Sequence, residues 1–251
     1  MASIRCDTGV MFWCEYPRDV VRIEGADAAT YLQSQVSQDL RSLEVGVSTW
    51  SFLLQPTGKV EVLMRVWRVA DDAFVLDTDA GFGEAMTARL NRFKIRVKAD
   101  ITPLDWHCIA VRGASYDGLS SWGEGADLLG ANVAAPAGIT HGSADDLLAA
   151  RVHAQWPAMG AEIASGHTLP AETGAATVAA AVSFTKGCYP GQELVERMDS
   201  RGASAPRSLM QVEVAEGTQP GSDLVVDGVV VGTVTSVSGT SALAMVKRSA
   251  Q

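Results

Sequence analysis

Several short stretches in the first half of the chain have the residue pattern of strands, and residues 60–69 alternate between hydrophobic and polar positions as a strand with one buried face does. These stretches are residues 20–23, 49–54, 60–69, 74–76 and 108–111. Turn residues separate them, among them Pro56, Thr57 and Gly58, and then the pair Asp71 and Asp72. The first half is therefore expected to contain short strands that pair with their neighbours in antiparallel fashion.

Two segments between these strands have the residue spacing of helices with one buried face. The first runs from about residue 28 to Leu40, and Asp27 is a suitable N-cap for it. The second covers residues 83–92, and a short helix is expected over residues 147–151. Strands mixed with helices in this order predict an α+β fold. Residues 118–142 are rich in Gly, Ala and Pro and are expected to be loosely structured.

The pattern changes after Ser208, where only strand-like stretches follow. Residues 209–214 alternate, and an Asp227–Gly228 turn predicts a hairpin over residues 225–230. Residues 234–237 and 243–246 complete the series. We expect a small β-barrel domain here, which divides the chain into domains of residues 1–203 and 204–251.

Composition and charge narrow the classes of function. The 251 residues include 20 Lys and Arg against 29 Asp and Glu, a net charge of -9. Such an acidic chain repels nucleic acid as a whole, so RNA contact would need a local basic patch. One candidate patch exists, and it could equally hold the anionic tail of a small molecule: Arg89, Arg92, Lys94, Arg96 and Lys98. Apolar runs are too short to span a bilayer, so no membrane role is expected.

The cysteines Cys6, Cys14, Cys108 and Cys188 form no C-x-x-C pair, and the four histidines lack zinc-type spacing. No structural metal site is expected. Reduced thiols fit a cytosolic protein, and the N-terminal residues do not have the basic-then-apolar pattern of a signal peptide.

Cys188 stands in a distinctive setting, within Lys186–Glu193, which reads KGCYPGQE. Pro190 suits a first helical position, which would place Cys188 just ahead of a helix. The positive helix end and the Lys186 ammonium would both favour a thiolate. A small buried hydrophobe is the alternative role for this cysteine, and the sequence pattern leaves both open.

Other residues of the segment could support a working thiol. Gly187 and Gly191 allow close backbone approach, and Gln192 supplies a donor and an acceptor. Glu193 and Arg197 are spaced to pair along a helix surface.

The eight residues from Lys186 to Glu193 resemble the K-G-C-Y-x-G-Q-E signature of the YgfZ-type folate-binding proteins, which are relatives of the glycine-cleavage aminomethyltransferases. Further parts of the chain are similar to this family: residues 21–28, 31–35 with Asp39, 53–54 with Pro56, Gly58 and Lys59, 93–98 and 182–184. The resemblance implies a tetrahydrofolate-binding α+β domain followed by a β-barrel. It also implies support of iron–sulfur enzymes or their assembly proteins, with one branch linked to tRNA methylthiolation.

The resemblance assigns roles to individual residues. Cys188 would be the functional residue, with Lys186 and Gln192 as its catalytic support, and the motif would also include Gly187, Tyr189, Gly191, Glu193 and Arg197. Folate contacts would come from Glu162, Glu61 and Arg151. A carboxylate such as that of Glu162 suits the N–H edge of a pterin.

Two departures from the family pattern matter for the chemistry. The Asp-Asp pair of the aminomethyltransferases corresponds to Glu61 and Val62, which argues against classical aminomethyl transfer. The R-x-E-A-G segment appears with His153 and Gln155 in place of its glutamate and glycine.

Three hypotheses therefore stay open: a folate-dependent helper of iron–sulfur cluster assembly or repair, an aminomethyltransferase-like enzyme, and a tRNA-modification factor. In the first, the thiol would ligate iron transiently, accept a sulfur or one-carbon unit, or exchange with a partner thiol. Trp50, Trp67 and Trp106 are expected to pack in the core, although a tryptophan could stack on a pterin.

Overall fold

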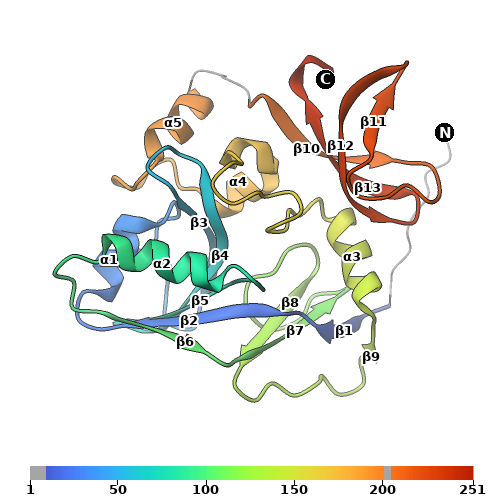
Figure 1. The fold of residues 1–251 in the computed structure, drawn as a ribbon. Coiled ribbons are helices and arrows are strands. Elements are labelled where there is room, and N and C mark those ends of the chain that lie inside the picture. The colour runs from blue at the N-terminus through green and yellow to red at the C-terminus, as the bar shows by residue number, and fades with distance from the viewer. Residues whose placement is uncertain (1–9, 201–204, 251) are drawn as a thin grey trace.

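The computed structural model describes residues 10–200 and 205–250. Within this part of the chain the strands form three sheets (Figure 1). The five-stranded sheet has the order β3-β4-β5-β2-β6, and all its neighbours are antiparallel. Its strands are β2 (Arg18–Glu24), β3 (Ser48–Leu54), β4 (Val60–Ala70), β5 (Ala73–Asp79) and β6 (Asp100–Leu104).

A second sheet, which we call the β1 sheet, has the order β8-β7-β1-β9. It consists of β1 (Phe12–Glu15), β7 (His107–Arg112), β8 (Gly125–Gly130) and β9 (Thr140–His141). The C-terminal sheet has the order β10-β13-β12-β11. It consists of β10 (Arg207–Glu213), β11 (Asp223–Val226), β12 (Val229–Ser238) and β13 (Ser241–Lys247).

The helices are α1 (Ala28–Gln35), α2 (Gly83–Phe93), α3 (Ala144–His153), α4 (Ala175–Ala181) and α5 (Gln192–Ser200), with short 3₁₀ helices η1 (Pro170–Thr173) and η2 (Arg248–Ala250). The α+β class with antiparallel sheets is confirmed. No helix among residues 10–200 and 205–250 combines the length and the apolar character that crossing a membrane would require.

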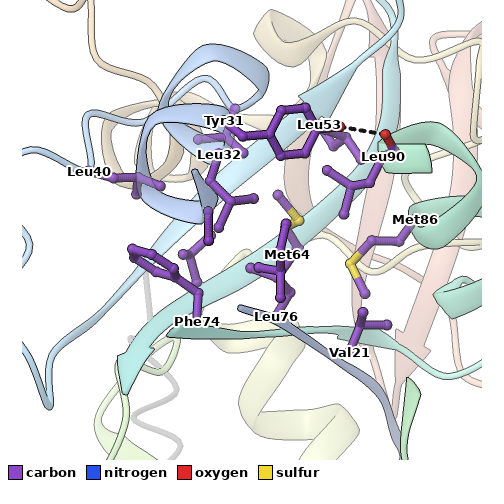
Figure 2. Close-up of a cluster of buried hydrophobic side chains, with 14 of the residues drawn as sticks. Val21, Tyr31, Leu32, Leu40, Leu53, Met64, Phe74, Leu76, Met86 and Leu90 are labelled. Atoms are coloured by element: carbon purple, nitrogen blue, oxygen red, sulfur yellow. Dashed lines mark hydrogen bonds between the residues drawn. The ribbon is translucent and has the colours of Figure 1, made fainter. Parts of the chain in front are cut away.

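Helices α1 and α2 cover one face of the five-stranded sheet (Figure 2). Leu32 from α1 and Met86 and Leu90 from α2 are fully buried against Met64 and Leu76 of the sheet. The Tyr31 hydroxyl donates to the Leu90 carbonyl, which ties the two helices together. This apolar layer is what fixes α2 beside β4, where a candidate site lies.

Helix α1 ends at Gln35, earlier than the predicted end near Leu40. The chain turns away there because Val36 bridges to Leu53 and the Ser37 N–H donates to the Phe52 carbonyl at 3.0 Å. Asp27 occupies the N-cap position, but its carboxylate accepts from the Lys98 N–H at 2.8 Å and not from the helix. Tertiary pairing therefore overrides both local signals.

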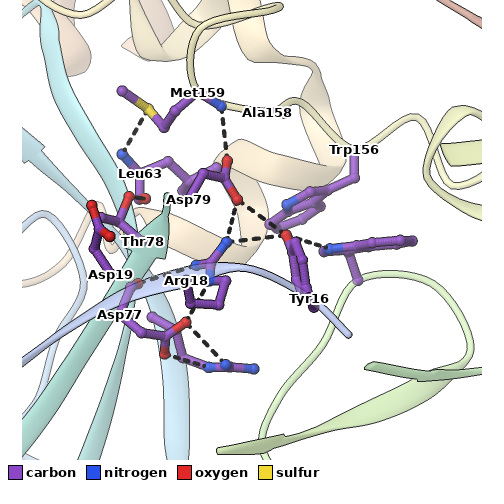
Figure 3. A network of polar contacts seen from close by, with 12 residues as sticks. Tyr16, Arg18, Asp19, Leu63, Asp77, Thr78, Asp79, Trp156, Ala158 and Met159 are labelled. Carbon is purple, nitrogen blue, oxygen red and sulfur yellow. Dashed lines mark hydrogen bonds and ion pairs between the residues drawn. The ribbon is translucent and has the colours of Figure 1, made fainter. Parts of the chain in front are cut away.

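The opposite face of the five-stranded sheet carries a buried chain of charges that leads to the β1 sheet. Figure 3 shows its first part, around Arg18 and Asp77. Asp77 binds the guanidinium groups of Arg18 at 2.7 Å and Arg65 at 2.9 Å. Arg65 also contacts Asp127 of β8 at 2.7 Å, and Asp127 pairs with Arg112 at 2.8 Å. Burial opposes these charges, yet the neighbouring carboxylates raise the pKa of Arg65 above its usual value. Positive and negative groups alternate along this chain, so the attraction between neighbours offsets the cost of removing the charges from water.

Glycine explains why part of the segment predicted to be loose is ordered. Residues 118–142 contain β8 and β9, in contrast to the expectation of a loose segment. Gly125 has a φ of 137°, and a Cβ there would lie 1.9 Å from the Val111 carbonyl oxygen. The absent side chain lets β8 pair closely with β7, so this glycine promotes order.

The predicted C-terminal β domain is present, but it is an open sheet and not a barrel. Strands β10 and β11 lie at opposite edges, and Arg207 at the start of β10 pairs with Glu172 of η1 at 2.8 Å. The predicted hairpin is present, with Val226 opposite Val229 and positive φ at Asp227 and Gly228. The predicted domain boundary at residues 203 and 204 lies outside the described residues.

Candidate functional site

The motif loop, residues 183–191, is anchored to the protein interior by Lys186. Its ammonium donates to the carbonyl oxygens of Gln33 at 2.7 Å, Val36 at 2.5 Å and Gln38 at 2.9 Å, where α1 ends. Burial lowers the pKa of Lys186 to about 8. A cation suits the carbonyl end of a helix, so Lys186 both caps α1 and commits all three of its N–H donors there.

Tyr189 and Gln192 fix the next part of the loop. The Tyr189 side chain is buried in the apolar cluster that contains Phe52 and Val195, and Lys186 Nζ lies 5.2 Å from the centroid of its ring. The Tyr189 N–H donates to Gln192 Oε1 at 3.0 Å. Helix α5 begins at Gln192, and Pro190 lies in the preceding turn instead of at the predicted first helical position.

Two glycines let the motif loop rest on the β3–β4 turn. Gly191 has a φ of 86°, and a Cβ there would lie 2.5 Å from the Gln55 carbonyl oxygen. Gly58 has a φ of 81°, and a Cβ there would lie 2.6 Å from Leu194 Cβ. Neither position can accept a side chain without displacement of backbone or core. The motif and the turn at residues 56–58, far apart in sequence, are therefore one structural unit.

Cys188 is exposed at the outer side of this loop, whereas Cys14 and Cys108 are buried. Burial raises the pKa of the Cys14 thiol to about 11 and that of Cys108 to about 12. Cys6 lies outside the described residues. A partner in solution can therefore reach Cys188 but not Cys14 or Cys108, which behave as small core residues.

The neighbours of Cys188 in the loop also face outward. Phe184 is 41% exposed, and a Cβ on Gly187 would meet nothing within 4 Å. Glu193 and Arg197 are exposed on α5, but the predicted ion pair between them is not formed. The outer side of the motif thus presents a thiol and an aromatic ring on a firmly held backbone.

Glu61 lies in a cleft of about 390 Å³ between the β3–β4 turn and α2. The lining residues are Gln55, Pro56, Thr57, Glu61, Ala85, Ala88, Arg89, Arg92 and Phe93. Gln55 Nε2 donates to Glu61 Oε2 at 2.7 Å and holds the carboxylate in place. The residues of the β3–β4 turn line this cleft and also touch the motif loop at Gly191, whereas Cys188 is not among the lining residues.

The predicted basic patch divides into a buried and an exposed part. Arg89 is 6% exposed and donates to the Leu54 carbonyl at 3.0 Å and to Gln35 Oε1 at 3.2 Å. Arg92, Arg96 and Lys98 are exposed, and Lys94 donates to the Ala99 carbonyl. The patch is therefore smaller at the surface than its sequence suggests.

Glu162 and Arg151 lie together and are not among the residues that line the Glu61 cleft. Glu162 Oε2 accepts from Arg151 Nη1 at 2.8 Å and from the Ala158 N–H at 2.9 Å. Glu162 Oε1 accepts from Ser236 of β12 at 2.6 Å, and Arg151 Nη2 donates to the same hydroxyl at 2.6 Å. Both side chains thus join α3 to the C-terminal sheet, and their predicted contact with folate stays a prediction.

Other predicted residues take mostly structural positions. Trp50 is buried 4.9 Å from the ring of Trp156, and the rings of Trp67 and Trp106 lie 6.4 Å apart. His153 and Gln155 line a groove of about 710 Å³ between α3 and the C-terminal sheet. Within residues 10–200 and 205–250, no cluster of three or more His, Cys, Asp or Glu side chains is arranged to hold a metal ion.

Comparisons with known proteins place the fold. No protein-family model matches the chain. It is 26% identical over 211 residues to an uncharacterized protein of Haemophilus influenzae, with 82% of this chain and 75% of that protein covered. It is 28% identical over 226 residues to the iron–sulfur cluster assembly factor IBA57 homolog, mitochondrial, of Pyricularia oryzae. That match covers 76% of this chain but only 54% of the relative, so the chain spans about half of that relative's length.

A solved structure is similar over nearly the whole chain. The glycine cleavage system aminomethyltransferase T from Bartonella henselae matches with a TM-score of 0.69 at 16% identity, and 96% of this chain and 79% of that chain are covered. The protein therefore has the aminomethyltransferase fold, which is the fold that the motif resemblance implies.

Proposed function

We propose that this protein binds tetrahydrofolate and assists the assembly or repair of iron–sulfur clusters in the cytoplasm, with Cys188 as its working thiol. The observation that carries the proposal is the exposure of Cys188 on a loop that Lys186 and Gly191 anchor. The similarity to a protein described as an iron–sulfur cluster assembly factor supports it.

A thiolate is the natural protein ligand of iron in such clusters. A cubane or rhombic cluster takes four ligands, and in this proposal Cys188 would supply one of them and a partner protein the others. The anchored backbone would hold the sulfur outward while the partner docks, and exposed Phe184 of the same loop offers an apolar contact. The cluster is the cargo in this proposal.

The cleft at Glu61 suits a reduced folate in its chemistry. Glu61 can accept N–H groups, Arg92 can donate to anionic groups, and Phe93 gives an apolar wall. The buried guanidinium of Arg89 also has a donor, Nη2, without a partner. A bound tetrahydrofolate would supply a carrier of one-carbon groups, and this chain would bind and orient it.

Replacement of the thiol is the main test. In cells that lack this protein, Cys188→Ser and Cys188→Ala should fail to restore the activity of a cluster-dependent enzyme, whereas the unmodified chain should restore it. Full rescue by the serine variant would remove the thiol from the mechanism. Titration with reduced tetrahydrofolate, followed by tryptophan fluorescence, tests cofactor binding separately.

An aminomethyltransferase-like reaction is a second candidate, because Glu61 lies in a cleft that can hold a ligand. If this reaction occurs, Glu61→Gln should lower folate-linked turnover of an aminomethyl donor by about 10²-fold or more, the loss typical of general acid–base groups. Absence of turnover in the unmodified protein would exclude this candidate.

A role in tRNA modification would use the basic patch of residues 89–98. Salt-sensitive tRNA binding that is lost when Arg92, Lys94 and Arg96 are neutralised would support this role. Absence of binding at low salt would end it.

A further inference from the structure

The cleft between α2 and the β3–β4 turn carries opposite charges on two of its walls. Helix α2 contributes Arg89 and Arg92, and strand β4 contributes Glu61, which Gln55 holds at 2.7 Å. Ala85, Ala88 and Phe93 provide apolar surface. A volume of about 390 Å³ falls at the lower end of the range of small-molecule pockets, about 300–1,000 Å³. The cleft therefore suits a compact ligand with an anionic group and an N–H donor.

Arg89 is the distinctive residue of this cleft, because its hydrogen bonding is incomplete. Nε donates to the Leu54 carbonyl at 3.0 Å and Nη1 to Gln35 Oε1 at 3.2 Å, whereas Nη2 is buried without a hydrogen-bond partner. The Phe93 ring centroid lies 4.0 Å from its guanidinium carbon. Buried polar groups in native proteins are nearly always paired, so an orphaned donor of a charged group indicates a missing partner.

The charges around Arg89 show what kind of partner is missing. Burial lowers the pKa of Arg89, and Arg92 lowers it further, whereas Tyr31 and Glu61 act in the opposite direction. The carbonyl and amide oxygens at Nε and Nη1 are neutral, so they stabilise the guanidinium less than a carboxylate would. Arg92 is exposed one helical turn further along α2 and forms no hydrogen bond or ion pair with the described residues. An anion at this end of the cleft would satisfy both arginines.

We propose that this cleft is a carboxylate-binding subsite, in which Arg89 Nη2 and the Arg92 guanidinium donate to the carboxylate and Glu61 accepts an N–H of the same ligand. The assignment of the ligand rests on the proposed function: in a folate, the aminobenzoyl-glutamate half carries carboxylates at one end and an N–H group at the other. That half lies along the cleft, with its glutamate toward α2.

The test separates the two halves of the cofactor and uses the whole 251-residue chain. p-Aminobenzoyl-L-glutamate is titrated by isothermal calorimetry into the unmodified chain, Arg92→Gln and Arg96→Gln. Arg96 belongs to the same basic patch but does not line the cleft, so Arg96→Gln is the matched control. We expect Arg92→Gln to weaken binding by at least tenfold and Arg96→Gln to leave it unchanged. Equal affinities in all three proteins, equal losses in both variants, or no binding to the unmodified chain would overturn the proposal.

Two further ligands keep this result distinct from the proposed function. Free L-glutamate should bind far more weakly than p-aminobenzoyl-L-glutamate if Glu61 and the apolar wall contribute, and equal binding would overturn the two-ended arrangement. Tetrahydrofolate that binds equally to the unmodified chain and to Arg92→Gln would preserve the folate hypothesis and overturn the subsite. Binding of p-aminobenzoyl-L-glutamate without binding of tetrahydrofolate would preserve the subsite and overturn the folate hypothesis.

Arg89 also donates two structural hydrogen bonds, so its role in binding is tested with a conservative variant that keeps the fold. Arg89→Lys keeps a positive charge at the site but cannot reproduce three directed contacts. Arg89→Lys should lower the affinity for p-aminobenzoyl-L-glutamate by at least tenfold, and urea unfolding should show that the variant is folded. A folded Arg89→Lys protein with unchanged affinity would exclude Nη2 as a ligand donor.

Discussion

The two sides of the motif loop differ in what they contact. On the inner side, Lys186 binds three carbonyl groups, Tyr189 is buried in the core, and Gly191 touches the β3–β4 turn. On the outer side, Gly187 and Cys188 are exposed, and Gly187 has free space around it. A contiguous eight-residue signature thus combines residues that build the loop with residues that present a thiol. Substitutions on the two sides should separate folding from function.

Truncation of the buried ring should have the largest effect. Tyr189→Ala removes an aromatic side chain from the apolar cluster and should lower the free energy of unfolding by about 3–5 kcal/mol. Cys188→Ala, one residue earlier but exposed, should change it by less than about 0.5 kcal/mol. Urea unfolding of both variants measures the contrast. Similar decreases in the free energy of unfolding of the two variants would mean that the inner and outer sides of the motif loop do not differ in their contribution to stability.

The glycine pair of the loop provides the next comparison. Gly191→Ala places a Cβ 2.5 Å from the Gln55 carbonyl oxygen at a positive φ, and should destabilise the fold by about 2–4 kcal/mol. Gly187→Ala is its control, because a Cβ there meets nothing within 4 Å. It should stay within about 0.5 kcal/mol of the unmodified chain. Thermal and urea unfolding compare the two, and a destabilised Gly187→Ala would contradict the open outer side.

Lys186 makes the inner side sensitive to pH. Its folded pKa of about 8 lies below the usual 10.5, so the unfolded chain binds more protons between these values. The free energy of unfolding should therefore rise with pH across this window, by about 1–2 kcal/mol once partial solvent access is allowed for. In Lys186→Met this rise should be absent. Urea unfolding of both proteins at pH 7.5 and pH 10 measures this rise. If the free energy of unfolding rises equally in the unmodified chain and in Lys186→Met, Lys186 keeps its proton in the folded protein.

The smallest effect on stability, and the clearest on reactivity, is expected at the thiol. Iodoacetamide should modify Cys188 in the folded protein, whereas Cys14 and Cys108 should react only after unfolding, because they are buried and their pKa values are raised. Peptide mass spectrometry locates the adducts. Protection of Cys188 in the folded chain would refute the exposure on which its role depends.

Local patterns predicted much of the fold. The alternation at residues 60–69 and the Asp227–Gly228 turn correspond to β4 and the β11–β12 hairpin. The errors come from long-range contacts: α1 stops because residue 36 pairs with Leu53, and β8 forms because Gly125 fits against β7. The C-terminal strands form an open sheet where a barrel was expected, because strand number and alternation do not determine whether the edges of a sheet meet.

The same division holds for the site. The sequence singled out Cys188 and Glu61 through their motifs, but it gave no sign that the Lys186 ammonium would bind carbonyl groups at residues 33–38. It grouped Arg89 with its basic neighbours, although the spacing from Met86 places Arg89 beside the buried face of α2. It also could not identify Ser236, because nothing in β12 marks a hydroxyl that meets Glu162 from another sheet.

The contact between Ser236, Glu162 and Arg151 has a consequence for expression of fragments. A chain that stops before Arg207 would leave a carboxylate with one oxygen unsatisfied, and would strip the cover from Leu148 and Val152 on α3. Such a truncated product should be unstable and prone to aggregate. Calorimetry of the 251-residue chain should give a single heat-absorption peak, because the two parts are expected to unfold together.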